Sequence, residues 1–144
     1  MPKRLAVGPI PQDTDVAILQ KQGVQAVLSL CQEMEPAIPL ALKTQFTWQG
    51  CWLPDSHYTE PMTAEHLVRA VAIVREQITA GRPTYVHCLA GQERSPTVCL
   101  AYLCRYERLN LFEALAWLKQ IHRRTRPTDN QIQAIQAFLA LEQR

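Results

Sequence analysis

The chain has 144 residues, of which 47% are apolar and 19% are charged, and its formal net charge is +2. This length and composition fit one folded domain with a single hydrophobic core and exclude a disordered chain. The near-neutral charge gives no basic field for nucleic acid or an anionic membrane, no apolar run could span a bilayer, and residues 1–8 lack the apolar stretch of a secretory signal.

The first part of the chain predicts two strands around a helix. Residues 5–7 are apolar and run into a Gly-Pro pair, which limits them to a short strand. Asp13 is placed to cap a helix that continues to about Gln22 and is ended by Gly23. The β-branched apolar run of residues 24–30 is typical of a strand in the middle of a sheet.

The next segment predicts a loop and a further strand. Proline-spaced residues 35–39 indicate a loop or short turn. Residues 46–53 alternate, with aromatic side chains on one face, and this alternation predicts a strand. We expect four aromatic side chains in the core: Trp48, Trp52, Phe112 and Phe138.

The second half of the chain changes to a helical period. Thr63 is placed to cap a helix that is stopped by Gly81. Residues 84–87 predict a short strand, and residues 96–106 predict a helix enclosed by the rest of the domain. Two further helices, residues 111–122 and a last one ending near residue 141, begin with the expected capping boxes Asn110–Glu113 and Thr128–Gln131.

Strands interleaved with helices in this order predict an α/β fold. We expect a single domain over residues 1–144, with a mainly parallel central sheet of about four or five strands flanked by helices. Ligands favour the carboxyl ends of the strands in such sheets. The loop from Cys88 to Arg94 follows the predicted strand of residues 84–87, so we expect it at that edge.

The motif that carries chemistry is His-Cys-Leu-Ala-Gly-Gln-Glu-Arg-Ser, residues 87–95. With five residues between Cys88 and Arg94, the loop can fold into a cup whose backbone N–H groups converge on an anion, helped by the start of the next helix. We call residues 88–94 the cup. Gly91 allows the backbone to turn, and Arg94 offers a bidentate fork. We predict that phosphate is bound by Leu89, Ala90, Gly91, Gln92, Glu93 and Arg94.

The same cup would stabilise negative charge on sulfur. We therefore expect Cys88 to be a thiolate near neutral pH and to attack phosphorus. The alternative is a chance coincidence of residues, and average residue usage gives His-Cys-x-x-Gly-x-x-Arg in roughly one in ten thousand chains of this length. The motif therefore indicates a catalytic site.

Residues 87–95 match the signature HCxxGxxRS, and in this the chain resembles the protein tyrosine phosphatase superfamily. Its small size and the sequence Leu-Pro-Asp at residues 53–55 resemble the dual-specificity phosphatase branch, over residues from about 5 to 138. The resemblance implies a dual-specificity phosphatase-like fold and a phosphocysteine intermediate on Cys88. It also implies phosphate binding by Arg94, a general acid at Asp55 and a hydroxyl at Ser95 that helps the thiolate leave.

Asp55 follows the predicted strand of residues 46–53, at another strand's end, where a carboxylate can protonate a leaving group and then activate water. The alternative is a turn or helix-cap aspartate. Glu60 and Glu93 are weaker alternatives as the acid, and a helix cap is the alternative for Ser95. Three other aspartates are interpreted as caps: Asp13, Asp15 and Asp129.

Other polar residues near the cup have two interpretations each. His57 and Tyr58 either contact the substrate or are exposed loop residues. His87 either holds the cup by hydrogen bonds or is merely buried. Arg126, within an arginine cluster, either contacts a second anionic group or belongs to a solvated basic loop. Gln131 is explained by its capping box.

Cys31 follows the strand of residues 24–30, at the same edge as the cup. Its placement resembles that in small relatives where a second cysteine bridges the oxidised nucleophile. This predicts either a reversible Cys31–Cys88 disulfide or a buried inert thiol. The chain has five cysteines and no CxxC pair, which argues against a disulfide scaffold and a structural zinc site. We expect no metal or other cofactor, and a reducing cytoplasm as the location.

The substrate is predicted from what the cup lacks. It has no lysine, whereas relatives that prefer phosphoinositides usually carry lysines there, and the chain has no long insertion that would deepen the site for phosphotyrosine alone. We predict a shallow site for phosphotyrosine, phosphoserine and phosphothreonine in proteins, in a monomer that binds neither nucleic acid nor membrane. Alternatives are a phosphatase of nucleotides, RNA 5′ ends or phosphoinositides, a rhodanese-like sulfur transferase, and a silent phosphate-binding module.

Overall fold

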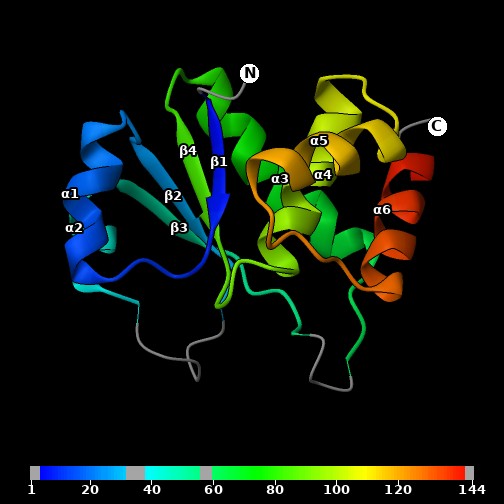
Figure 1. Ribbon diagram of the computed structural model, residues 1–144, viewed down its shortest axis with the longest axis horizontal. Helices are drawn as coiled ribbons and strands as arrows, with labels where there is room; N and C mark the ends of the chain where they lie inside the picture. Colours follow the sequence, from blue (N-terminus) through cyan, green and yellow to red (C-terminus); the bar gives the residue numbers. More distant parts are fainter. Residues whose placement is uncertain (1–3, 32–37, 56–59, 142–144) are drawn as a thin grey trace.

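The computed structural model describes residues 4–31, 38–55 and 60–141. These residues form one sheet with helices on both of its faces (Figure 1). The strands are β1 (Leu5–Gly8), β2 (Ala26–Ser29), β3 (Thr47–Gly50) and β4 (Thr84–His87). The helices are α1 (Asp13–Lys21), α2 (Leu40–Gln45), α3 (Ala64–Thr79), α4 (Arg94–Tyr106), α5 (Leu111–Ile121) and α6 (Asp129–Leu141).

The sheet has the strand order β1-β4-β2-β3, and every neighbouring pair is parallel. The four strands therefore point the same way, and their carboxyl ends meet at one edge, as the arrows in Figure 1 show. His87 at the end of β4 lies opposite both Gly8 of β1 and Ser29 of β2. The predicted α/β fold with a parallel sheet of four or five strands is confirmed.

Two hydrophobic cores lie on the two faces of the sheet. The larger one packs α3 and α4 against β2 and β4, with α5 and α6 outside them (Figure 1). The smaller one joins α1 and α2 to the opposite face, around Val27, Leu42 and Tyr85. Helix α4 lies deepest, because all ten residues from Arg94 to Leu103 are buried. This helix begins at the cup, so the cup is anchored directly in the larger core.

Three predicted helix caps are confirmed, and one is wrong. Thr63, Asn110 and Thr128 each take part in the expected capping box. At α1 the N-cap is Gln12, whose N–H donates to Asp15 Oδ2 at 2.8 Å. Asp13 is the first residue of the helix and not its cap, because the acceptor for the unpaired N–H comes from one turn further on.

Several elements differ from the sequence-based prediction. Helix α2 was not predicted, and the strand expected over residues 46–53 is confined to β3, Thr47–Gly50. Of the aromatic residues expected in the core, Phe138 is fully buried, but Phe112 is 88% exposed. Phe112 lies in the first turn of α5, whose buried side is formed by Ala114 and Leu118. Trp48 and Trp52 are half-buried.

In the described part of the chain, no helix combines the length and the apolarity that crossing a membrane requires.

Candidate active site

The cup connects β4 to α4 at the carboxyl edge of the sheet. Its residues and Asp55 surround a small cavity of about 110 Å³. The residues that line this cavity are Asp55, Cys88, Leu89, Ala90, Gln92, Glu93 and Arg94. The structure therefore brings the predicted nucleophile, the predicted acid and the predicted phosphate-binding arginine around one space.

Four carbonyl groups of the cup accept hydrogen bonds from groups outside the loop. The Cys88 carbonyl lies 3.1 Å from His87 Nδ1, and the Leu89 carbonyl accepts from the Ile10 N–H at 3.0 Å. The Gly91 carbonyl lies 2.5 Å from His122 Nε2. The Gln92 carbonyl accepts from the Arg126 N–H at 2.6 Å.

These bonds determine where the amides of the cup point. A trans peptide is planar, so its C=O and the following N–H point in opposite directions, and the described chain has no cis peptide. The four bonded carbonyls therefore turn the N–H groups of the following residues away from their donors. Those residues are Leu89, Ala90, Gln92 and Glu93, the same four that line the cavity beside Cys88, Asp55 and Arg94. Such converging amides form an anion-binding concavity.

Gly91 does not line the cavity, and its contribution is to the turn. Its φ is +73°, in the left-handed region that favours glycine. A Cβ at this position would lie 2.5 Å from Pro9 N and 2.7 Å from Gly8 C. The cup is thus pressed against the chain that follows β1, and only glycine fits there.

Cys88 and Ser95 lie together beneath the cup. Cys88 is 2% exposed and Ser95 is fully buried, and Cys88 Sγ lies 3.2 Å from Ser95 Oγ. The Ser95 hydroxyl also lies 3.1 Å from the Gly8 carbonyl, to which it donates. A hydroxyl has one hydrogen, so it can donate either to the carbonyl or to the sulfur, but not fully to both. Negative charge on Cys88 would draw that hydrogen toward the sulfur.

Arg94 links the two sides of the cavity. Its side chain is 4% exposed, and Nη2 forms an ion pair with Asp55 Oδ2 at 3.2 Å. Nη1 approaches the Leu53 carbonyl at 3.5 Å. Asp55 itself is 18% exposed, so it lies between the arginine and the solvent. The guanidinium faces the same space as the cup amides and the Cys88 sulfur.

His87 is buried in a hydrogen-bonded network behind the cup. Its Nε2 lies 2.6 Å from Ser29 Oγ, which accepts a second bond from Trp48 Nε1 at 2.8 Å. All of its bonds are satisfied together when the His87 hydrogen is on Nδ1, donating to the Cys88 carbonyl, and the Ser29 hydroxyl donates to Nε2. The predicted holding position of His87 beside the nucleophile is therefore matched by geometry.

The remaining predicted residues are spread around the cup. His57 and Tyr58 lie outside the described residues. Glu93 lines the cavity as the N-cap residue of α4, whereas Glu60 is exposed and does not line it. Cys31 is buried two residues beyond the end of β2, and it is a thiol, as is Cys88. The Cys31–Cys88 disulfide stays a prediction, which non-reducing mass mapping after peroxide treatment would test.

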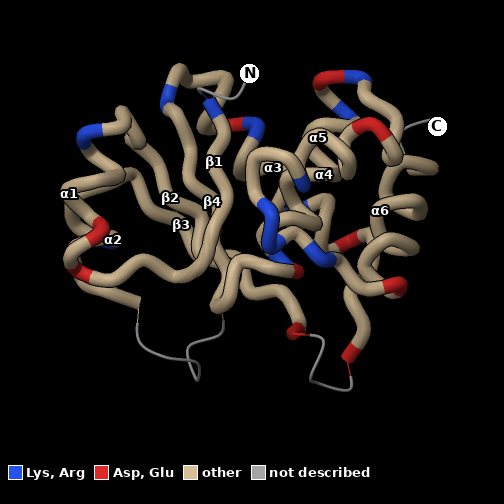
Figure 2. The backbone as a smooth tube through the Cα atoms, viewed as in Figure 1, with Lys and Arg blue, Asp and Glu red and all other residues tan. Residues whose placement is uncertain are grey.

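The connection between α5 and α6 contacts the cup through its backbone and through His122. Figure 2 shows Lys and Arg residues gathered on this connection. Its three arginines, Arg123, Arg124 and Arg126, are all exposed. Gln131 is buried in its capping box, where its Oε1 accepts from the Thr128 N–H at 2.8 Å, so the structural interpretation of this residue is confirmed.

Sequence reasoning missed the residues that support the cup from outside. Ile10 and Gly8 act through backbone atoms, which leave no signal in side-chain type. His122 lies 31 residues from its partner Gly91, and no local pattern connects the two. The one usable signal was that the arginine-rich connection should lie near the cup, which marks the neighbourhood but not the residue.

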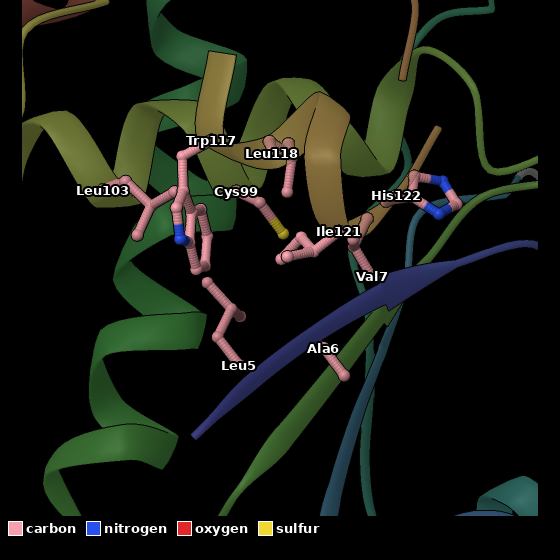
Figure 3. A pocket seen from close by; sticks show the side chains of 9 residues that line it. All are labelled: Leu5, Ala6, Val7, Cys99, Leu103, Trp117, Leu118, Ile121 and His122. Atoms are coloured by element: carbon pink, nitrogen blue, oxygen red, sulfur yellow. The ribbon is translucent and has the colours of Figure 1, made fainter. Parts of the chain in front are cut away.

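A second cavity, of about 210 Å³, lies away from the catalytic groups between β1, α4 and α5 (Figure 3). It is lined by apolar side chains such as Leu5, Leu103 and Trp117, and His122 lies at one end. Burial raises the pKa of the Cys99 thiol in its wall and, first among several causes, that of the Tyr85 phenol near the cup. Both groups therefore stay protonated at neutral pH. Tyr85 donates to the Pro9 carbonyl at 2.7 Å and so supports the segment behind the cup.

The parallel sheet and the cup with its cysteine and arginine define the class of cysteine-dependent phosphatases. Residues 7–140 match the family described as "Dual specificity phosphatase, catalytic domain". The chain belongs to this family. In the described residues no cluster of three or more His, Cys, Asp or Glu side chains could hold a metal ion.

Curated relatives include both lipid and protein phosphatases. The chain is 28% identical over 138 residues to phosphatidylglycerophosphate phosphatase PTPMT2 of Arabidopsis thaliana, covering 96% of this chain and 60% of that protein. It is 31% identical over 120 residues to dual specificity protein phosphatase Mpk3 of Drosophila melanogaster, covering 83% of this chain and 28% of that protein. The chain thus spans less than two thirds of the length of these relatives.

Solved structures show the same fold. Human tyrosine phosphatase-like serine/threonine/tyrosine-interacting protein superposes with a TM-score of 0.86 at 18% identity, covering 98% of this chain and 94% of that one. PTPMT1 in complex with PI(5)P superposes with a TM-score of 0.82 at 19% identity, covering 96% and 92%. At these identities the likeness concerns the fold.

Proposed function

We propose that the protein hydrolyses phosphomonoesters through a covalent phosphocysteine on Cys88. The observation that carries this proposal is the single cavity that Cys88, Arg94 and Asp55 line together with four residues whose amides face away from their external donors. A tetrahedral dianion in this space would meet a sulfur nucleophile below it, N–H groups around it and a guanidinium beside it.

In the first step the Cys88 sulfur attacks phosphorus, and the bond between phosphorus and the ester oxygen breaks. The leaving oxygen takes a proton from Asp55, which lines the outer side of the cavity. To bind the dianion, Arg94 exchanges its ion pair with Asp55 for the phosphate oxygens, which also releases the carboxyl group for proton transfer.

In the second step a water molecule attacks phosphorus and gives a proton to Asp55. The S–P bond breaks, inorganic phosphate leaves, and the electron pair returns to the Cys88 sulfur. The Ser95 hydroxyl, 3.2 Å from that sulfur, donates its hydrogen to the departing thiolate instead of to the Gly8 carbonyl.

For the substrate, we propose a glycerophospholipid head group with a terminal phosphomonoester, such as phosphatidylglycerophosphate. The lack of lysine in the cup argues against inositol rings with several phosphates, but a single phosphomonoester needs no further cation inside the cup. A neighbouring phosphodiester would lie at the rim, where the exposed Arg123, Arg124 and Arg126 supply positive charge. The relatives named phosphatidylglycerophosphate phosphatases favour this choice.

Phosphotyrosine, phosphoserine and phosphothreonine in proteins form the second candidate. The small volume of the cavity supports a shallow site, and relatives named dual specificity protein phosphatases match most of the chain. In this case the arginines of the α5–α6 connection would contact acidic residues that flank the phosphorylated one. The location in the cytoplasm and the monomeric state also stay predictions.

The test compares phosphate release from vesicles containing phosphatidylglycerophosphate, from phosphopeptides and from 4-nitrophenyl phosphate. We expect release from all three to require Cys88, and the vesicles to give the highest kcat/KM. Replacing Arg123, Arg124 and Arg126 together with alanine should lower the rate on vesicles about tenfold and leave the rate on 4-nitrophenyl phosphate unchanged, because exposed cations act on charged surroundings. A preference for phosphopeptides would favour the second candidate, and no release from any substrate would contradict the proposed function.

A further inference from the structure

One peptide unit of the cup is held in place by a side chain from a distant part of the sequence. His122, the residue that ends α5, directs Nε2 to the Gly91 carbonyl at 2.5 Å. This carbonyl and the N–H of Gln92 belong to the same peptide unit, so the bond to His122 determines which way that N–H points. Gln92 lines the catalytic cavity, and Gly91 does not.

The Gly91–Gln92 peptide is the unit of the cup that local sterics restrain least. Turning a peptide over changes ψ of the preceding residue and φ of the following one, and a glycine tolerates both orientations better than any other residue. Gly91 cannot be replaced by a stiffer residue, because a Cβ would collide with Pro9 and Gly8. The orientation of this peptide therefore depends on an external donor.

His122 is well placed to act as that donor. Its own N–H donates to the Leu118 carbonyl at 2.8 Å, and its carbonyl accepts from Thr125 Oγ1 at 2.7 Å, so the backbone from which the ring projects is fixed. The ring is half-buried and lies at the end of the apolar cavity, beyond Val7 and Ile121 (Figure 3). A ring nitrogen that carries its hydrogen can donate to only one described carbonyl there, that of Gly91.

We propose that His122 is a positioning residue that keeps the Gly91–Gln92 peptide in its anion-binding orientation. The inference rests on the proposed function, because it assigns His122 a role in binding the transferring phosphoryl group without touching it. Without the His122 donor, the peptide turns over in part of the molecules, which removes the Gln92 N–H from the cavity and points a carbonyl oxygen toward the phosphate. The loss is therefore greater for the anion than for folding.

The test uses a pair of substitutions at this position, His122→Phe and His122→Gln. Phenylalanine keeps a ring but cannot donate, whereas the glutamine amide can reach a position close to that of Nε2 and donate from it. For His122→Phe we expect kcat/KM on 4-nitrophenyl phosphate to fall about 10- to 100-fold, somewhat less than for removal of a transition-state donor outright, and the Ki of orthovanadate to rise by a similar factor. His122→Gln should restore both values to within about threefold of wild type.

A matched control separates this role from the stability of α5. Asn110→Ala removes the cap at the opposite end of the same helix, where its side chain accepts from the Glu113 N–H at 2.8 Å. It should lower Tm without changing the Ki of orthovanadate. If His122→Phe does not fold, His122→Asn takes its place, because the shorter amide does not reach Gly91, and the same loss is expected.

Three results would overturn the proposal. They are an unchanged orthovanadate Ki in His122→Phe, an equal loss in His122→Gln, and an equal loss in Asn110→Ala. The proposed function is judged separately, by phosphate release from the wild-type chain. If that release is absent, the affinity for tungstate, measured by calorimetry on the same variants, still reports whether His122 orients the amides of the cup.

Discussion

The two sides of the catalytic cavity are built differently. Cys88, Arg94 and Ser95 are almost completely buried and belong to β4, α4 and the loop between them, in the centre of the larger core. Asp55, on the other side, is partly exposed and follows β3, the edge strand of the sheet. An ion pair of 3.2 Å between Arg94 and Asp55 joins the two sides.

This difference separates what every substrate needs from what only some substrates need. The nucleophile side binds and attacks the phosphoryl group, which all phosphomonoesters share. The acid side acts on the leaving group, which differs between substrates. Substitutions on the first side should therefore impair all reactions alike, whereas substitutions on the second side should impair them according to the leaving group.

The largest effect is expected for Cys88→Ser, which removes the sulfur nucleophile from the buried side. Phosphate release should fall on the order of 10⁴-fold or more for every substrate, because no other described group in the cavity can form the covalent intermediate. Tungstate binding, measured by calorimetry, should persist because the amides and Arg94 remain. Turnover close to that of wild type would end the phosphocysteine mechanism.

The next effect, for Asp55→Ala, should depend on the ester. With an alkyl or phenyl phosphate, kcat should fall about 10²- to 10³-fold, the usual contribution of a positioned acid. With 2,4-dinitrophenyl phosphate, whose leaving group needs no proton, the loss should shrink to less than about tenfold. Steady-state kinetics across a series of aryl phosphates provides the measurement. An equal loss for all members of the series would assign Asp55 another role.

Ser95→Ala tests a step that belongs to the nucleophile side but not to the attack. Loss of the hydroxyl near Cys88 Sγ should slow hydrolysis of the phosphocysteine about 10- to 100-fold, the value of one hydrogen bond to a charged group. The first step should change less, so stopped-flow traces should show a burst of 4-nitrophenol followed by slow turnover. If the burst slows as much as the turnover, Ser95 acts mainly in the first step.

The smallest effect concerns the stability of the acid side. His66 accepts the Thr63 N–H on Nδ1 at 2.9 Å, and its ring contacts that of Trp52, three residues before Asp55. Burial, aided by Arg69, lowers the pKa of His66. The unfolded chain therefore takes up this proton first as the pH falls, so stability decreases below about pH 6.5.

His66→Gln should reduce this loss, because glutamine at the same capping position accepts the N–H and does not titrate. Thermal unfolding at about pH 7.5 and about pH 5.5 should give a Tm decrease that is smaller in the variant by about 2–4 °C. Parallel decreases in both proteins would show that His66 does not contribute to the pH dependence.

The features that could be predicted from sequence are those fixed by neighbouring residues. The capping boxes at Thr63, Asn110 and Thr128 act over three residues, and the Cys88–Arg94 spacing acts over six, so each leaves a local pattern. Helix α2 left no such pattern, because it has six residues and one fully buried side chain, Leu42, which packs in the smaller core. Its stability comes from packing against distant residues.

The support of the cup could not be predicted for the same reason. Its donors come from Ile10, His122 and Arg126, and two of these act through the backbone. Phe112 was misplaced because its apolar side chain was considered without its position on α5, where the buried positions are Ala114 and Leu118. Sequence thus indicated which residues carry the chemistry, but not which ones hold them in place.

The burial of α4 has a consequence for how this enzyme can change over evolutionary time. Ten successive residues from Arg94 onward are enclosed, so a substitution that repacks the helix would also displace the guanidinium and the hydroxyl at its start. Drift in the interior is therefore constrained by activity as well as by folding. New substrate ranges would arise more easily through the partly exposed segment before Asp55 and the arginines after α5, where replacements leave the interior intact.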